Sequence, residues 1–159
     1  MLEYDVEILA KDITYHVADI NCNGIDPVIV SSRSCEVPLD VLRAEPFNLE
    51  YPDLVAAKVR SRNINGWSDY SDINTEGGSI LTEPSVMGVP TRGTSTDTTR
   101  LHVEWVGLEG DDLRGSYVTS YWLQWDNGSN GLSWYDLVGA DSAYLYYEYI
   151  TTSNDIIPG

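Results

Sequence analysis

The chain has 159 residues, which is enough for one domain or for two small β-sandwiches. Its 25 acidic residues against 9 basic ones give a net charge of −16, which excludes nucleic acid and anionic membranes as partners because both would be repelled. Eleven Tyr and five Trp beside one Phe, with 13 Gly and 7 Pro, indicate a turn-rich β protein. No apolar run approaches the roughly 20 residues of a membrane span, and the first residues lack a secretion-signal pattern. We therefore expect no membrane insertion in this chain.

The first residues have the pattern of a β-hairpin. Residues 4–8 alternate in the manner of a strand, and residues 13–17 form a second candidate strand after a polar break. Turn chemistry follows at residues 21–24. The two cysteines, Cys22 and Cys35, flank this irregular region. A disulfide between them would stabilise the fold by roughly 3 kcal/mol in the chain-entropy model; two buried thiols are the alternative.

The middle of the chain holds one clear strand. Before it, residues 28–30 form a β-branched run, and residues 38–43 could form one helical turn before a proline. From Leu54 onward, small and apolar residues alternate with basic ones, so one strand face packs and the other carries three cations. These cations are Lys58, Arg60 and Arg62. Residues 63–66, Asn-Ile-Asn-Gly, tolerate positive φ and predict a tight hairpin turn.

A segment that is rich in glycine and proline separates the two halves of the chain. Residues 73–90 contain a Gly-Gly pair and two prolines, which marks a domain boundary near Thr82. Beyond it, alternating apolar and polar residues predict strands at 100–105, 118–125, 133–137 and 144–152, with a turn at 126–131.

The end of the first half resembles the fibronectin type III domain. Members of that family have an alternating apolar strand followed by Asn-x-x-Gly-x-Ser-x-x-Ser across the last hairpin. Here the strand contains Val59, and the pattern continues through Asn63, Gly66, Ser68 and Ser71. The resemblance implies that a domain ends near residue 82.

The second half is similar to the opening strands of the same domain. It has a proline-led start at residues 84–90, the family's buried tryptophan at Trp105 and the next strand's tyrosine at Tyr121. In the first half the family's leucine is present at Leu49. The tyrosine that normally ties down a loop near the sixth strand is replaced by Val55, and the disulfide is expected to compensate.

The resemblance implies an all-β fold of two immunoglobulin-like, fibronectin type III β-sandwiches in tandem, each incomplete within this chain. Residues 1–82 would be the third strand onward of one domain, and residues 83–159 the first strands of the next. This stagger implies either a fragment of a longer repeat array or a protomer whose domains are completed by neighbouring chains. Together, the segments 63–68, 125–129 and 133–139 are similar to tandem repeats of large surface proteins of single-celled eukaryotes, which implies an extracellular or cell-surface location. A glycosylation sequon at Asn127 agrees with that setting.

Residues 67–71, Trp-Ser-Asp-Tyr-Ser, also resemble the Trp-Ser-x-Trp-Ser motif of cytokine receptors, whose aromatic side chains alternate with strand cations. Because the three cations share a strand face and Trp67 begins the adjacent strand, we expect the guanidinium of Arg60 or Arg62 to stack on Trp67. Asp69 would close an ion pair on that face. A ligand-binding elbow and an unstacked surface are the alternatives.

The sequence offers no convincing catalytic or metal site. His16 and His102 have no Cys or carboxylate spacing typical of metal ligands, so we expect ordinary strand residues. Asp111-Asp112 and residues 72–76 could offer oxygens to Ca²⁺, but neither follows calcium-loop spacing, which favours solvated acidic loops. Nucleophile elbow, phosphate-loop and zinc-protease motifs are missing from the sequence. We expect a protein that is not an enzyme and has no cofactor.

Three classes of function follow. The first is a non-enzymatic structural repeat module of a surface fibre or filament, whose partners are other copies or adjacent repeats of the same polypeptide. The second is a receptor or adhesion module that binds a protein or glycan at the elbow between domains. The third is an accessory module of a carbohydrate-degrading enzyme. The last predicted strand has tyrosines on both of its faces, so one face either contacts a neighbouring protein or is exposed to solvent. These tyrosines are Tyr144, Tyr146, Tyr147 and Tyr149.

Overall fold

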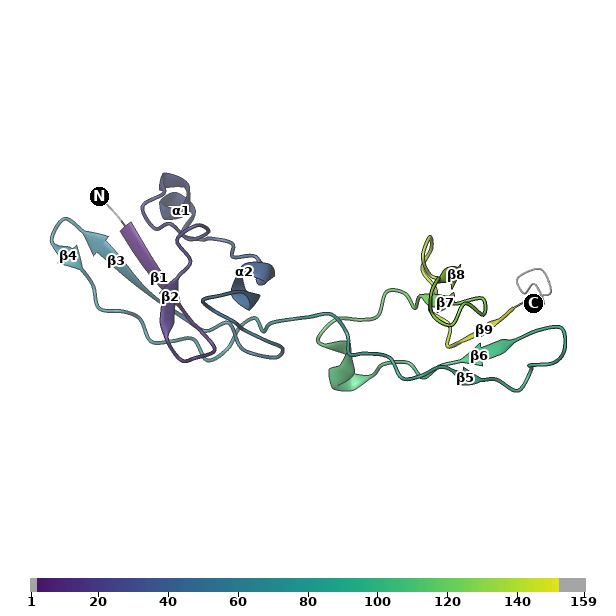
Figure 1. Ribbon diagram of the computed structural model, residues 1–159. Helices are drawn as coiled ribbons and strands as arrows, with labels where there is room; N and C mark the ends of the chain where they lie inside the picture. The colour runs from purple at the N-terminus through teal and green to yellow at the C-terminus, as the bar shows by residue number, and fades with distance from the viewer. Residues whose placement is uncertain (1–2, 152–159) are drawn as a thin grey trace. The chain divides into compact units, whose positions relative to one another are not determined.

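The computed structural model describes residues 3–151. The chain divides into two compact units, Met1–Thr82 (unit 1) and Glu83–Gly159 (unit 2), and Figure 1 labels the elements of each. Every strand pairing in the described residues is antiparallel, and the helices are few and short. The fold is therefore β-rich, as the composition indicates. No helix among the described residues has the length and apolar character needed to cross a bilayer.

Unit 1 is built on a four-stranded antiparallel sheet. In spatial order its strands are β2 (Tyr15–Val17), β1 (Glu3–Leu9), β3 (Ala57–Asn63) and β4 (Gly66–Trp67). The predicted hairpin of the first seventeen residues is confirmed, since β1 and β2 pair from Glu7↔Val17 to Leu9↔Tyr15. On its other edge β1 pairs with β3, so the two longest strands form the centre of the sheet.

The predicted hairpin turn joins β3 to β4. Of the four residues expected to tolerate positive φ, only Gly66 adopts it, at 136°. Asn63 contributes differently: its side-chain Oδ1 accepts a hydrogen bond from the Asn65 backbone N–H at 2.8 Å. Asn side chains commonly fix turns in this way, so the turn prediction is right, although its asparagines act through side chains and not through φ.

The segment between β2 and β3 contains two short helices, α1 (Pro27–Ser32) and α2 (Leu39–Arg43). The helical turn expected at residues 38–43 is confirmed by α2. The β-branched run at residues 28–30 lies in α1, because Asp26 caps the helix by accepting from the Val28 N–H at 2.7 Å and Pro27 occupies the first helical turn. These start signals outweigh the strand preference of Val and Ile.

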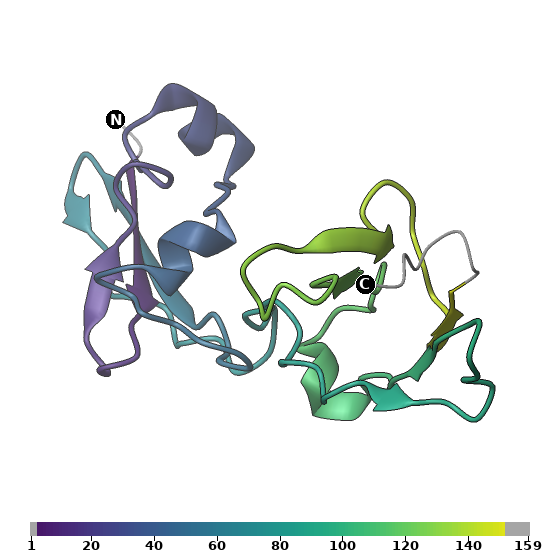
Figure 2. The same cartoon turned by 45° about the vertical axis from the view of Figure 1, so that its right-hand side comes forward.

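The core of unit 1 lies between the sheet and this helical segment. Figure 2 shows α2 beside the sheet, and Leu42 of α2 packs in the same buried cluster as Ile8 of β1. The other buried members are Ala18, Cys22, Phe47, Leu49 and Ile80. On the expected packing face of β3, Ala57 packs against this cluster but Val59 is exposed. The core therefore covers only the first part of that face.

The predicted disulfide is confirmed, because Cys22 and Cys35 are bonded. Cys22 is buried in the core, and the bridge closes the loop that contains α1. The disulfide therefore fixes both ends of the α1 loop to the core, against which Cys35 also packs.

Replacing both cysteines by alanine is expected to lower the free energy of unfolding of unit 1 by about 3 kcal/mol, chiefly by freeing the unfolded loop. Urea denaturation under non-reducing conditions, followed by circular dichroism, measures this loss. The wild-type protein in excess reductant serves as the matched control and should lose a similar amount. Unchanged midpoints in both samples would contradict a stabilising disulfide.

Unit 2 contains one three-stranded sheet and one hairpin. The sheet has the order β5 (Thr91–Arg92), β6 (His102–Glu104) and β9 (Glu148–Ile150). The hairpin consists of β7 (Leu123–Trp125) and β8 (Tyr135–Val138), and a 3₁₀ helix, η1 (Gly110–Leu113), precedes it.

The four strands predicted in unit 2 are shorter in the structure. The strand expected at 100–105 covers His102–Glu104, and the one expected at 133–137 covers Tyr135–Val138. The strand expected at 118–125 begins only at Leu123, and the one expected at 144–152 covers Glu148–Ile150; Thr152 lies outside the described residues. Next to these strands, Trp105 N–H donates to Tyr147 O at 2.9 Å, in the register of the β6–β9 pairing. Three residues earlier, Tyr144 O accepts instead from Tyr121 N–H, in the segment before β7, at 2.7 Å.

Candidate functional site

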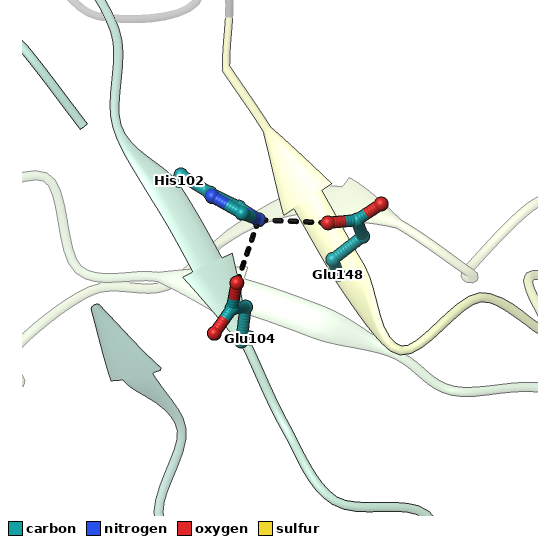
Figure 3. A group of neighbouring side chains, drawn as sticks. All are labelled: His102, Glu104 and Glu148. Atoms are coloured by element: carbon teal, nitrogen blue, oxygen red, sulfur yellow. Dashed lines mark hydrogen bonds and ion pairs between the residues drawn. The ribbon is translucent and has the colours of Figure 1, made fainter. Parts of the chain in front are cut away.

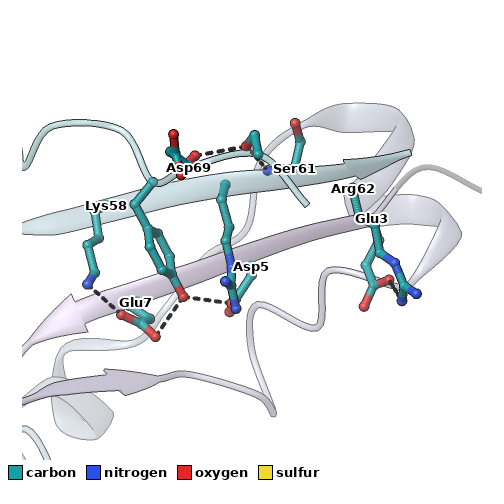
Figure 4. Close-up of polar contacts among 10 residues, drawn as sticks. Glu3, Asp5, Glu7, Lys58, Ser61, Arg62 and Asp69 are labelled. Atoms are coloured by element: carbon teal, nitrogen blue, oxygen red, sulfur yellow. Dashed lines mark hydrogen bonds and ion pairs between the residues drawn. The ribbon is translucent and has the colours of Figure 1, made fainter. Parts of the chain in front are cut away.

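Opposite charges face each other across the centre of the unit 1 sheet. Side chains two positions apart on a strand lie on one face, so the alternating acids of β1 and the alternating cations of β3 form two facing rows. The register pairs them as Glu3↔Arg62, Asp5↔Arg60 and Glu7↔Lys58. Figure 4 shows the carboxylates of β1 beneath the cations of β3.

The central pair is the best connected of the three. Nε and Nη2 of Arg60 both donate to Oδ2 of Asp5, at 2.9 and 2.7 Å. Lys58 Nζ lies 2.8 Å from a Glu7 carboxylate oxygen. The outer pair, Arg62 with Glu3, has one contact at 3.2 Å, and the Arg62 side chain is 52% exposed. Because solvent screens exposed pairs, the outer pair contributes least.

Aromatic rings lie between these cations. Lys58 Nζ is 3.9 Å from the ring centre of Tyr15 and 4.2 Å from that of Tyr70. The Arg60 guanidinium carbon lies 4.5 and 4.7 Å from the ring centres of Tyr70 and Trp67, and Arg62 lies 5.7 Å from Trp67. All these distances allow a cation–π attraction. We call this set the ladder; in order it is Tyr15, Lys58, Tyr70, Arg60, Trp67 and Arg62.

Tyr70 connects the two charged rows. Its hydroxyl lies 2.8 Å from Asp5 Oδ2 and 2.7 Å from Glu7 Oε1. Its single proton is therefore shared between two carboxylates. Burial and these carboxylates raise the pKa of Tyr70 well above its usual value. Hydrogen bonds from Lys58 and then Tyr70 lower the pKa of Glu7. The hydroxyl thus remains a donor to an ionised carboxylate at neutral pH.

The ladder should lose stability at both ends of the pH scale. The folded-state pKa of Glu7 is lowered, so its contribution is complete above the unfolded value of 4.5 and is lost as pH falls through the folded value. The folded-state pKa of Tyr70 is raised, so its contribution is complete below 10.0 and is lost as pH rises toward the folded value. We expect the melting temperature of the Glu7→Gln variant to change less between pH 7 and pH 3 than that of the wild type. An identical acid-induced decrease in both proteins would contradict this role of Glu7.

The structure brings together four of the five residues expected in the ladder. Arg60 and Arg62 lie over Trp67, as expected, and Lys58 stacks on Tyr15 and Tyr70. The fifth, Asp69, does not close the expected ion pair. Its side chain is exposed, and its backbone carbonyl accepts from the Ser68 hydroxyl at 2.8 Å. The expected role of Asp69 is therefore wrong, because the carboxylates of β1 already occupy the cations.

The serines of the Trp-Ser-Asp-Tyr-Ser stretch hold the chain against the free edge of β3. Ser68 N–H donates to Ser61 O at 2.9 Å, while the Ser68 hydroxyl accepts from Ser61 N–H at 3.1 Å. Ser71 repeats both bonds with Val59, at 2.8 and 3.1 Å. Asn74 repeats them with Ala57, its side-chain Oδ1 accepting at 2.6 Å. These side chains replace the backbone acceptors that a regular strand would supply.

This edge clamp, formed by Ser68, Ser71 and Asn74, explains how Trp67 and Tyr70 are positioned. The three clamp residues are three positions apart and bond alternate residues of β3. The intervening aromatic side chains are thereby held beside the cations. The clamp was not expected from the sequence, although the Ser-x-x-Ser-x-x-Asn spacing at residues 68–74 was a signal for it.

Unit 2 has a separate polar cluster on β6 and β9. His102 is buried, and its Nε2 lies 2.9 Å from Glu148 Oε2 and 3.4 Å from Glu104 Oε1. Figure 3 shows both carboxylates converging on the imidazole from neighbouring strands. The three ligand atoms lie within 4.8 Å of one another, a spacing that a metal ion could bridge. His102 lies in β6, as expected of a strand residue, but its two carboxylate partners were not expected from the sequence. Glu104, two residues along the same strand face, is the signal in the sequence for one of them.

The hydrogen bond at the second ring nitrogen of His102, Nδ1, argues against a metal ion bound at Nε2. Ser95 N–H points at His102 Nδ1, at 3.3 Å, so Nδ1 accepts and the proton of the neutral ring lies on Nε2. If Nε2 bound a metal ion, the ring proton would have to lie on Nδ1. There it would face the Ser95 N–H, and two donors would point at each other. Gly93 also packs against the ring, where a Cβ would lie 2.2 Å from Nδ1. The cluster fits a histidine that donates to carboxylates and joins β6 to β9.

Trp105 and Tyr121, predicted to be core residues, are both buried, with ring centres 5.9 Å apart. Tyr144 is partly buried and packs beside Trp105, and its hydroxyl donates to Glu148 O at 2.7 Å. The expected interface tyrosines thus divide between two roles. Of these, Tyr146 and Tyr147 are exposed, whereas Tyr144 and Tyr149 are partly buried.

The remaining predicted sites lie on loops. Asn127 is exposed in a turn with φ of 47°, where its side chain is accessible for glycosylation. Asp111 and Asp112 lie in η1, and Asp112 O accepts from Ser85 N–H at 2.8 Å. Among residues 3–151, the only group of three or more His, Cys, Asp or Glu side chains with metal-ligand spacing is the His102 cluster, and the acidic loops form no such group.

The geometry of the two clusters supports attachment of strands to each other, by charge, stacking and side-chain hydrogen bonds. No protein-family model matches the chain, and no curated protein matches it.

Proposed function

We propose that this chain is a non-enzymatic structural module of an extracellular or cell-surface protein. In this proposal the two units are parts of fibronectin type III-like sandwiches arranged in tandem along a surface fibre. The partners are other copies or neighbouring repeats of the same polypeptide.

The observation that carries the proposal is the ladder. Each of its three cations engages a carboxylate of β1 and at least one aromatic ring. The hydroxyl of Tyr70 is likewise directed at Asp5 and Glu7. The polar groups of this face therefore satisfy one another, which serves to hold β1, β3 and the clamped edge together. Such an arrangement suits a load-bearing sheet better than a binding surface.

The order of the strands supports the tandem sandwich. Such sandwiches pack two antiparallel sheets face to face. Unit 1 has the four-stranded order β2–β1–β3–β4, and unit 2 has the three-stranded order β5–β6–β9 beside a separate hairpin. Each unit thus resembles a different part of one sandwich, in agreement with the staggered domains implied by the sequence resemblance.

The disulfide supports the proposed location. Stable disulfides form mainly in secreted and surface proteins, whereas cytosolic thiols are kept reduced. The bond between Cys22 and Cys35, together with the accessible sequon at Asn127, is consistent with passage through an oxidising compartment.

Immunogold electron microscopy tests the proposed function. Antibodies raised against the 159-residue chain would be applied to intact cells of the source, with antibody pre-adsorbed on the antigen as control. We expect gold particles on surface fibres at a regular spacing. Labelling that appears only after permeabilisation would overturn the proposal, and surface labelling without fibres would favour an adhesion module instead.

A further inference from the structure

The outer face of the β7–β8 hairpin carries two exposed tryptophans with a polar pair between them. Trp122 Nε1 and Gln124 Nε2 both donate to Asp136 Oδ1, at 2.9 and 2.8 Å, so these three side chains lie on one face. The alternation of a strand places Trp134, two positions before Asp136, on the same face. Trp122 and Trp134 are 61% and 59% exposed. A further strand beside β7 would extend the sheet sideways and leave this face open, so the face belongs to the hairpin alone.

The chemistry of this face suits a neutral sugar. Within residues 3–151, nothing donates to Asp136 Oδ2 and no cation pairs with the carboxylate. Gln124 has one more N–H to donate and a carbonyl oxygen to accept. A sugar hydroxyl both donates and accepts, whereas an ammonium or guanidinium group only donates. The exposed indoles add apolar surface that the C–H face of a sugar ring can cover, and the net charge of −16 repels anionic ligands.

The turn of the same hairpin carries the glycosylation sequon. Asn127 and Gly128, with φ of 47° and 74°, form the centre of a turn that is closed by Ser129 N–H donating to Asp126 O at 2.9 Å. The two carboxylate oxygens of Asp126 accept from the N–H groups of Gly128 at 3.1 Å and Gly131 at 3.0 Å. The exposed side chain of Asn127 is thus attached to a turn that its neighbours hold in place.

Trp134 lies beside this turn, and Trp122 lies at the far end of the face. Continuing the register of the hairpin places Trp134 opposite Asp126, the residue before Asn127. Trp122 is four strand positions before Asp126, which puts it about 13 Å further along the hairpin. A single sugar on Asn127 can therefore reach the first of these rings but not the second.

We propose that the N-glycan of Asn127 folds back on its own hairpin, with its first N-acetylglucosamine stacked on Trp134 and its following sugars directed toward Asp136 and Gln124. Glycosylation joins Asn127 Nδ2 to C1 of that first sugar; Nδ2 gives up one proton, and the diphosphate of a lipid-linked oligosaccharide donor is the leaving group. Because the glycan is tethered, a weak contact acts at a high effective concentration. The contact stabilises a two-stranded hairpin, which is marginal on its own in water. The inference rests on the proposed extracellular location, since N-glycans belong to secreted and surface proteins.

Two forms of the 159-residue chain test the contact. One is secreted from cultured mammalian cells behind an added signal peptide and is trimmed by an endoglycosidase to a single N-acetylglucosamine. The other is produced without glycan in a bacterial periplasm, so that the disulfide forms in both. Hydrogen exchange read by mass spectrometry follows the backbone amides of β7 and β8. We expect about fivefold slower exchange in the glycosylated form, because the sugar removes one face of an indole from water.

Trp134→Ala and Trp122→Ala are matched variants, since each removes an exposed indole from the same face. In Trp134→Ala the two forms should exchange at equal rates, whereas Trp122→Ala should keep the difference, because the single sugar does not reach its position. Nuclear magnetic resonance gives an independent readout. The ring current of Trp134 should shift the acetyl methyl signal of the sugar upfield in the wild type and in Trp122→Ala, and this shift should vanish in Trp134→Ala.

Three results would overturn the proposal. The first is an unmodified Asn127 in the secreted protein, and the second is equal slowing of exchange by the sugar in the wild type and in Trp134→Ala. The third is loss of the effect in Tyr135→Ala but not in Trp134→Ala, which would place the sugar on the opposite face of the hairpin, where Tyr135 is exposed. All three concern the isolated chain, so they are distinguishable from a failure of the proposed surface fibre, which microscopy decides.

Discussion

Replacing Trp105 by alanine is expected to lower the free energy of unfolding of unit 2 by about 3–5 kcal/mol, the usual cost of truncating a buried tryptophan. The side chain is 8% exposed and packs against Tyr121 and Tyr144. A small domain has only about 5–10 kcal/mol in total. The variant should therefore lose a large part of the stability of unit 2, with much faster exchange there, while unit 1 keeps its stability.

Trp122→Ala is the matched control, because it removes the same side chain from an exposed position. We expect a change within about 0.5 kcal/mol. Hydrogen exchange read by mass spectrometry follows each unit separately, with the amides of β6 and β9 as the readout for unit 2. Normal protection of these strands in Trp105→Ala would contradict the assignment of Trp105 to the core.

Replacing Asp5 by alanine should cost unit 1 about 2 kcal/mol, the range for hydrogen bonds to a charged group. The Asp5 side chain is 18% exposed and accepts from Arg60 and from the Tyr70 hydroxyl. Its removal leaves both donors with fewer acceptors in a partly buried setting. For a domain of this size the loss corresponds to a decrease in melting temperature of roughly 8–16 °C.

Glu3→Ala is the control for this prediction, since it removes a carboxylate from the same row of β1. Its pair with Arg62 is exposed on the arginine side, so the expected cost is below about 1 kcal/mol. Thermal unfolding at low and high salt measures both variants. Equal losses for Asp5→Ala and Glu3→Ala would show that the central pair has no special place in the ladder.

The sequence was informative where a periodic pattern decided the structure. The alternation from Leu54 to Arg62 predicted a strand with its three cations on one face, and β3 has that arrangement. Two cysteines with a short separation predicted the disulfide. These features depend on neighbours along one segment, which a single sequence displays directly.

Features that depend on partners distant in sequence were missed. The carboxylates that pair with the ladder come from β1, more than fifty residues away, whereas the sequence alone points to Asp69, which is near in the chain. Glu148 reaches His102 only through the pairing of β9 with β6. Alternation alone does not reveal which strands pair or in what register.

The central claim is that the chain works outside the reducing cytosol as a structural module, and the redox state of Cys22 and Cys35 in the native protein tests it most directly. Protein taken from the source cells would be alkylated at once without reductant, digested and analysed by mass spectrometry. The account predicts a cross-linked pair of peptides containing Cys22 and Cys35, with neither cysteine alkylated. Complete alkylation of both thiols would contradict it.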